Sequence, residues 1–208
     1  MSSGSPGDLI VLTADKDAKV VMEELMRRHA DLGIRPIDVD IYPHPQHDNG
    51  VLKRSHDFLR FLLKWRYALV VFDHEGSGRE DKARTVLEEE VENRLAANEW
   101  ENRSKAIVID PELEAWVWDG SCQVSRFLDW PGGPRELQPW LKREGFAGPG
   151  DPKPRRPKEA LQDAMFQRRI SRSSSHFREM ARDFRFRGCV DPAFVKFRST
   201  LHTWFPLP

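Results

Sequence analysis

Two short apolar runs, each ending in acidic residues, constrain the fold of this 208-residue chain most strongly. Residues 68–72 (ALVVF) lead into residues 73–75 (DHE), and residues 106–109 (AIVI) lead into residues 110–114 (DPELE). Runs this short and this apolar are typical of strands buried on both faces, as in a parallel sheet covered by helices. The carboxyl ends of such strands face one crevice, where α/β proteins bind their ligands. The pattern therefore predicts an acidic crevice at one edge of a sheet.

Strand-like and helix-like patterns alternate around these two runs. Residues 8–12 form a third apolar run, and residues 36–42 alternate apolar and polar side chains, which indicates an edge strand with one wet face. Apolar residues recur at helical spacing over residues 17–30, 51–64 and 80–98. This alternation predicts an α/β fold with a mostly parallel sheet of about four strands flanked by helices.

Beyond residue 110 the sequence predicts helices only. They are expected over residues 112–118, 121–130, 134–144, 158–169, 175–186 and 191–205. A long loop over residues 145–157, rich in Gly, Pro and Arg, divides them into two groups. We therefore expect an α/β domain over residues 1–150 and, packed on it, a basic helical extension over residues 151–208.

Charge is balanced over the whole chain but not along its length. The chain has 33 basic and 33 acidic residues, yet residues 1–150 hold 20 against 27 and residues 151–208 hold 13 against 6. A basic segment after an acidic body is typical of contact with nucleic acid or an acidic protein, although a solvated helical surface has the same composition. The residues expected to bind phosphate or a partner are Lys153, Arg155, Arg156, Lys158, Arg168 and Arg169.

The acidic crevice has the donor chemistry of a divalent-cation site. Carboxylates crowded at one edge repel one another unless they extend into solvent, take up protons or hold a cation. Mg²⁺ or Mn²⁺ is the expected cofactor, and Asp73, Glu75 and Glu114 are the catalytic residues if the chain is an enzyme. Such carboxylates also cap helices or pair with basic residues, here Arg79 or Arg84. The candidate metal ligands are Asp15, Asp73, Glu75, Glu112 and Glu114.

A histidine-rich stretch offers a second candidate for metal binding. His44, His47, Asp48 and His56 are residue types that bind zinc. No cysteine lies near them in the sequence to supply the soft ligands of a structural zinc site. Solvated loop histidines are the alternative interpretation.

Several protein classes are excluded by composition. Cys122 and Cys189 are far apart and lack the spacing of a zinc site or a disulfide framework. No stretch approaches the roughly 20 apolar residues that a membrane-spanning helix needs, and the first residues do not have the pattern of a secretion signal. We therefore expect a cytoplasmic protein without a membrane partner.

The acidic motifs resemble those of the Toprim superfamily, the catalytic domain of topoisomerases, primases and nucleases of the overcoming-lysogenization-defect type. Asp73-x-Glu75 is similar to the Asp-x-Asp motif that follows a later strand of that fold. Glu112-Leu-Glu114-Ala-Trp116, with a later Pro157-Lys158, is similar to one branch of Toprim-like proteins. The resemblance covers about residues 9–165 and implies a Toprim-like fold that holds Mg²⁺. Where the superfamily has a glutamate after its first strand, this chain has Asp15, which leaves catalysis open.

Longer stretches resemble a small component of bacterial methylation-associated defence systems, which act against phages. These stretches are VLTADKDA, VVFDHEGSGRED, AIVIDPELEAWVW and KPRRPKEAL. The resemblance implies antiviral defence, with other proteins of the defence operon, and DNA or RNA, as candidate partners. The departure at Asp15 favours a component that assembles with or recognises other defence proteins. The retained carboxylates favour a Mg²⁺-dependent nuclease or phosphodiesterase, so both hypotheses stay open.

Overall fold

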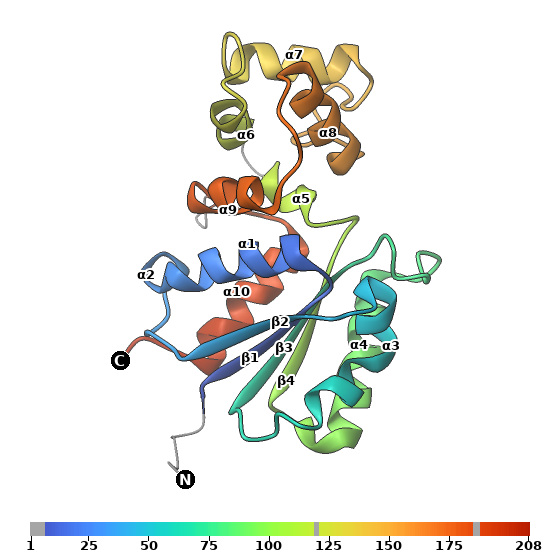
Figure 1. The fold of residues 1–208 in the computed structure, drawn as a ribbon, viewed down its shortest axis with the longest axis vertical. Helices are drawn as coiled ribbons and strands as arrows, with labels where there is room; N and C mark the ends of the chain where they lie inside the picture. Colours follow the sequence, from blue (N-terminus) through green and yellow to red (C-terminus); the bar gives the residue numbers. More distant parts are fainter. Residues whose placement is uncertain (1–6, 119–120, 185–187) are drawn as a thin grey trace.

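A parallel sheet forms the centre of the protein (Figure 1). The computed structural model describes residues 7–118, 121–184 and 188–208, which form one four-stranded sheet in the order β2-β1-β3-β4. Its strands, parallel in every neighbouring pair, are β1 (Leu9–Thr13), β2 (Val39–Pro43), β3 (Tyr67–Asp73) and β4 (Ser104–Ile109). The predicted α/β class, with a helical C-terminal part, is confirmed.

Helices cover both faces of this sheet because successive strand residues point to opposite sides. Leu9 and Val11 of β1 pack in one apolar cluster, and Ile10 and Leu12 pack in the other. The first face carries α1 (Lys16–Arg27), α2 (His29–Leu32) and α10 (Pro192–Trp204). The second carries α3 (His47–Leu59), α4 (Arg84–Leu95) and the short turn η1 (Ala96–Trp100).

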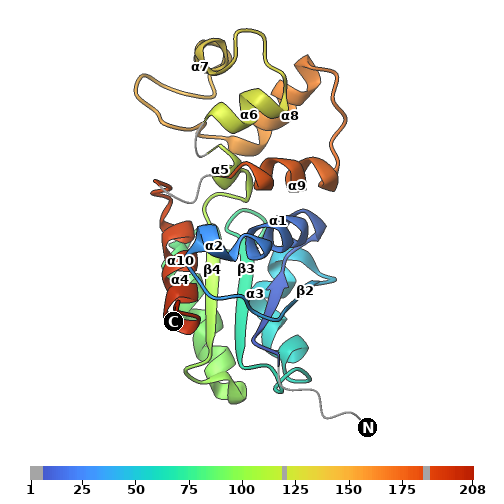
Figure 2. The same ribbon diagram turned by 90° about the vertical axis from the view of Figure 1, so that its left-hand side faces the viewer.

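The remaining helices build a second layer beyond the carboxyl ends of the strands (Figure 2). After β4 the chain passes through α5 (Glu114–Val117) into α6 (Ser121–Phe127), α7 (Pro134–Arg143) and α8 (Pro157–Gln167), which together we term the helical lobe. It then returns through α9 (Ser174–Arg182), which packs on α1, and α10, which packs on β4. The helical lobe therefore takes residues from both sides of the boundary expected near residue 150.

Buried tryptophans and one aspartate join α5 to α8 and α10. Trp118 donates from Nε1 to the carbonyl oxygen of Pro157 at 2.8 Å, and Trp116 donates to Asp191 Oδ1 at 3.1 Å. Asp191 also accepts from the backbone N–H of Ala193 at 3.0 Å and so caps α10. These bonds satisfy both indole N–H groups in a site closed to water.

The structure also bears on the two cysteines and on the expectation of no membrane-spanning helix. Cys189 is buried, whereas the side chain of Cys122 lies outside the described residues. No helix in the described part of the chain combines the length and apolar character that crossing a bilayer requires.

Candidate acidic crevice at the carboxyl edge of the sheet

The strand order puts the switch point of the sheet between β1 and β3, and we keep the term acidic crevice for the carboxylates gathered there. β1 leads into α1 on one face of the sheet, whereas β3 leads into α4 on the opposite face (Figure 1). Two adjacent parallel strands whose connections diverge in this way leave a crevice outside their carboxyl ends. Asp15 lies two residues beyond β1, and Asp73 is the last residue of β3. Both of these predicted site residues therefore lie at the switch point of the sheet.

Asp73 and Asp48 form the centre of this crevice. The backbone N–H of Asp73 donates to Asp48 Oδ1 at 2.8 Å, and both residues are half-buried. Burial raises the pKa of Asp73 well above its usual value, and the neighbouring charges of Asp48 and Glu114 raise it further. Burial also raises the pKa of Asp48. The two carboxylates therefore lie where negative charge is unfavourable.

No basic side chain in the described residues forms an ion pair with Asp73. Arg79 contacts Glu90 at 3.4 Å and Arg84 contacts Glu88 at 2.7 Å, so neither arginine takes the neutralising role that the sequence offered it. Asp73 instead accepts a backbone hydrogen bond from Leu113, which lowers its pKa but less than burial raises it. Asp73 is thus a half-buried carboxyl group with no ion pair among the described residues, although the charge of Lys158 acts on it.

Glu112 and Glu114 lie beside this centre and are held by cations from the C-terminal part of the chain. Glu112 is 1 % exposed and accepts from the backbone N–H of Lys158 at 2.8 Å, and from its Nζ at 3.3 Å. Glu114 is 4 % exposed and pairs with Arg172 at 3.3 Å. Burial, followed by the charge of Glu112, raises the pKa of Glu114 to about 7, although Arg172 opposes the rise. Lys158 and Arg172 therefore form the basic rim of the crevice.

Two other predicted acids have different surroundings. Asp15 caps α1, because its Oδ1 accepts from the backbone N–H of Ala18 at 2.8 Å. Glu75 is exposed, and its backbone N–H donates to the carbonyl oxygen of Pro111 at 2.9 Å. Asp15 still contributes charge, since it raises the pKa of Asp73 together with the closer carboxylates.

The basic residues expected to face phosphate or a partner mostly have contacts within the chain. Lys153 pairs with Asp191 at 2.7 Å, and Arg155 pairs with Asp151 at 2.8 Å. Arg168 donates to the carbonyl oxygen of Leu128 at 3.0 Å. The two with the most open surroundings are Arg156, which lies over the Phe146 ring, and Arg169; both are exposed.

Within the described ranges, no three His, Cys, Asp or Glu side chains are gathered closely enough to hold a metal ion between them. This holds for the acidic crevice and for the histidine-rich stretch alike. Mg²⁺ usually takes only one or two carboxylates and completes its shell with water and substrate phosphates. Asp48 and Asp73, which supply carboxylate oxygens, suit that cation.

Two residues of the crevice were not predicted to belong to it. Asp48 looked like part of a histidine-rich loop, yet it lies in the first turn of α3, directly after β2. The rule that strand ends share one edge points to it once β2 is placed in the sheet. Arg172 reaches Asp17 and Glu114, which are 155 and 58 residues away in the sequence, and no local pattern signals such contacts.

A scan against models of protein families and searches of curated proteins and of solved structures each found no match.

Proposed function

We propose that the acidic crevice binds Mg²⁺ or Mn²⁺ together with a phosphate of nucleic acid, and that the protein is a phosphodiesterase of bacterial antiviral defence. The observation that supports this most is Asp73, a half-buried carboxyl group at the switch point of the sheet that has no ion pair among the described residues. Structural carboxylates are normally paired or fully solvated when ionised. A cation supplied with the substrate would relieve the repulsion that Asp73 now experiences.

Each residue of the crevice has a distinct part in this proposal. Asp48 and Asp73 would hold the cation, with water and phosphate oxygens completing its shell, and Glu114 would add negative charge beside it. The cation would neutralise negative charge on the phosphate oxygens. Lys158 and Arg172 have side chains that are 42 % and 38 % exposed, so both can turn from their glutamates toward an incoming phosphate. Lys158 also opens α8, where the helix N-terminus favours an anion.

Thermal denaturation in the presence of Mn²⁺ tests the cation. Binding to the folded state alone raises the melting temperature as the concentration of Mn²⁺ exceeds the dissociation constant. We expect this rise in the wild-type protein and its loss in Asp73→Asn. Asp129→Asn is the matched control, because the Asp129 side chain is fully exposed in the helical lobe. An identical Mn²⁺ response in all three proteins would contradict the proposal.

Hydrolysis is tested separately with single-stranded and duplex oligonucleotides in Mg²⁺ and Mn²⁺. Wild-type protein should cleave in a manner that depends on the metal, and Asp48→Asn and Asp73→Asn should abolish cleavage. If the wild-type protein binds Mn²⁺ yet cleaves nothing, alone or with its operon partners, the proposed phosphodiesterase activity is wrong and only the proposed cation site is supported.

A second candidate function, assembly with other proteins of the defence operon, rests on a different surface. Phe166 on α8 is 80 % exposed and lines a pocket of about 820 Å³ together with Met165, Ile170 and Arg169. An exposed aromatic residue beside arginine is typical of the energetic centres of protein interfaces. Loss of a co-purifying operon protein in Phe166→Ala and Arg169→Glu, with metal binding intact, would support this function.

A further inference from the structure

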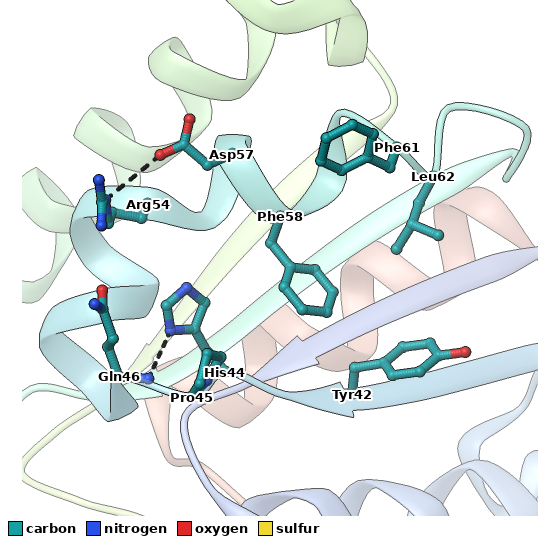
Figure 3. Close-up of a pocket in the computed structure, with 9 residues that line it drawn as sticks. All are labelled: Tyr42, His44, Pro45, Gln46, Arg54, Asp57, Phe58, Phe61 and Leu62. Atoms are coloured by element: carbon teal, nitrogen blue, oxygen red, sulfur yellow. Dashed lines mark hydrogen bonds and ion pairs between the residues drawn. The ribbon is translucent and has the colours of Figure 1, made fainter.

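A separate pocket lies between the end of β2 and α3, on the outer side of the sheet edge (Figure 3). Its volume is about 550 Å³, within the range of sites for small molecules. Apolar and polar side chains gather at different ends of it, as Figure 3 shows. The lining residues are Tyr42, His44, Pro45, Gln46, Arg54, Asp57, Phe58, Phe61 and Leu62.

The apolar end of the pocket is aromatic and open to solvent. Tyr42, which lies in β2, is 40 % exposed, and Phe61, two residues beyond the end of α3, is 74 % exposed. The Phe58 ring lies between Tyr42 and His44, with 6.1 Å between ring centroids on each side. The Arg60 guanidinium covers one face of Phe61 at 4.4 Å. Aromatic surface left open in this way is suited to stacking a planar ring.

The polar end presents hydrogen-bonding groups to the same space. The Gln46 backbone N–H donates to His44 Nδ1 at 3.1 Å, so that nitrogen is an acceptor and the other, Nε2, carries the proton of the neutral ring. Nε2 has no hydrogen-bond partner in the described residues. Gly50 makes this arrangement possible, because a Cβ there would lie 2.5 Å from His44 Nδ1. The polar end therefore offers a fixed donor, the Gln46 amide and the Arg54 guanidinium.

The polar end is also the end nearest the acidic crevice. The backbone N–H of His44 donates to the carbonyl oxygen of Thr13, the last residue of β1, at 2.8 Å. Gln46 and Asp48 belong to the same turn at the start of α3, with Gln46 in the pocket and Asp48 in the crevice. A ligand that spans this turn would therefore reach both sites.

We propose that this pocket binds a nucleobase, with the attached phosphate directed toward the acidic crevice. The base stacks on Tyr42 and Phe61, and its edge bonds to His44 Nε2 and Gln46. The direction of the phosphate rests on the function proposed above, whereas stacking of the base does not. The base can come from a free nucleotide or from single-stranded nucleic acid, whose bases are free to stack on side chains.

A nucleobase suits these groups better than a side chain from a partner protein. An aliphatic or phenyl side chain would fill the aromatic end of the pocket. It would leave His44 Nε2 and the side-chain amide of Gln46 without hydrogen-bond partners, which costs binding free energy. Every base has a stacking face and an edge with both donors and acceptors. The cationic Arg54, whose side chain is 60 % exposed, favours a ligand that carries a phosphate.

Binding measured in EDTA tests this proposal without any contribution from a metal. A short fluorescein-labelled oligothymidylate is titrated by fluorescence anisotropy, its duplex with oligoadenylate serves as the non-stacking form, and adenosine monophosphate is followed by saturation-transfer NMR. The variants are Tyr42→Ala and Phe61→Ala, whose side chains are too exposed to support the core. Leu207→Ala is the matched control, because Leu207 is an exposed apolar side chain, 60 % exposed, that does not line the pocket.

We expect Tyr42→Ala and Phe61→Ala each to weaken binding of the single strand about tenfold, the scale of one lost stacking partner, with Leu207→Ala unchanged. If only the nucleotide signal depends on these side chains, the ligand is a free nucleotide. Equal binding of both probes by wild type, Phe61→Ala and Leu207→Ala would overturn the proposal. Loss of a co-purifying operon protein from Phe61→Ala, with both probes unaffected, would assign the pocket to that protein and overturn it as well.

Two measurements on the wild-type protein distinguish this proposal from the function on which its second part rests. Binding of the single strand in EDTA reports on the pocket, which Asp73 does not line, and the response to Mn²⁺ reports on the cation site. If the single strand binds in EDTA and the protein shows no response to Mn²⁺, base binding is supported and the cation site is refuted. If Mn²⁺ binds and neither probe does, the cation site stands and the base pocket falls.

Discussion

The backbone N–H of Asp73 donates a 2.8 Å hydrogen bond to the carboxylate of Asp48. This bond joins the last residue of β3 to the first turn of α3, although the strand that precedes α3 is two places away in the sheet. It also places two carboxylates together where burial disfavours their charge. Repulsion at this point opposes folding at neutral pH, as is common at sites kept for binding.

Asp73→Asn should therefore stabilise the protein without metal at pH 8. The folded-state pKa of Asp73 is raised, so its contribution to stability is fully present below the unfolded pKa near 4 and is lost as pH rises toward the folded value. The amide cannot ionise and escapes this loss. We expect a gain of about 1 to 3 kcal/mol in the free energy of unfolding at pH 8, and none near pH 4.

Urea denaturation in EDTA at the two pH values measures this gain. Asp129→Asn, fully exposed, should change the free energy of unfolding by less than about 0.5 kcal/mol at either pH. A gain at pH 8 that persists undiminished at pH 4 would show that repulsion is not its cause.

Glu114 should titrate near neutral pH. Burial and the charge of Glu112 raise its pKa to about 7, so carboxyl-carbon NMR should show one glutamate with a midpoint near pH 7, well above the ordinary value of 4.5. Glu114→Gln identifies the signal by removing it. Arg172→Gln should move the midpoint higher, because Arg172 favours the ionised form. A midpoint near the ordinary glutamate value would refute the assignment of Glu114 to a buried, acidic environment.

Glu112→Ala should destabilise the protein strongly. Glu112 is buried and accepts hydrogen bonds from both the backbone N–H and Nζ of Lys158, so its loss leaves those donors without a partner at the start of α8. We expect a cost of about 2 to 3 kcal/mol by urea denaturation. The exposed pair of Arg143 and Glu144 supplies the control, since Glu144→Ala should cost less than about 0.5 kcal/mol.

Arg155 and Arg156 allow a test of nucleic-acid contact through the basic loop. If both contact phosphates, the double variant Arg155→Gln, Arg156→Gln should make the log–log salt slope of duplex binding shallower by about 1.8, and of single-strand binding by about 1.4. All sequences should weaken alike, because phosphate contacts carry no sequence information. A slope that does not change would place these exposed arginines outside the nucleic-acid interface.

The sheet could be predicted because its information is local. The apolar runs at residues 8–12, 68–72 and 106–109 correspond to β1, β3 and β4, and alternation marked β2 as an edge strand although its start was placed three residues early. The predicted helix over residues 80–98 begins instead at Arg84. Glu80 bonds to the backbone N–H groups of Gly76 and Gly78 and so belongs to the preceding turn.

The crevice could be predicted only in part because its electrostatics are not local. Asp73 was found by its position at a strand end, but whether it had a partner depended on where Arg79 and Arg84 point. Both arginines form ion pairs with glutamates of α4 instead. The partners of Glu112 and Glu114 come from 46 and 58 residues further along the chain. Composition predicted a basic C-terminal part, but it did not predict that Lys158 and Arg172 of this part pair with the glutamates of the crevice.

The return of the chain from the helical lobe to the sheet makes the charge balance of the crevice a property of the whole chain. Glu112 and Glu114 precede the lobe, whereas Lys158 and Arg172 follow its first helices. A fragment that stops after α5 would keep the acids, lose both cations and uncover the face of β4 that α10 occupies. The α/β part is therefore not a module that could be excised with its site intact. Removal of the chain from the loop before α8 onward would leave surplus negative charge at the ends of the strands.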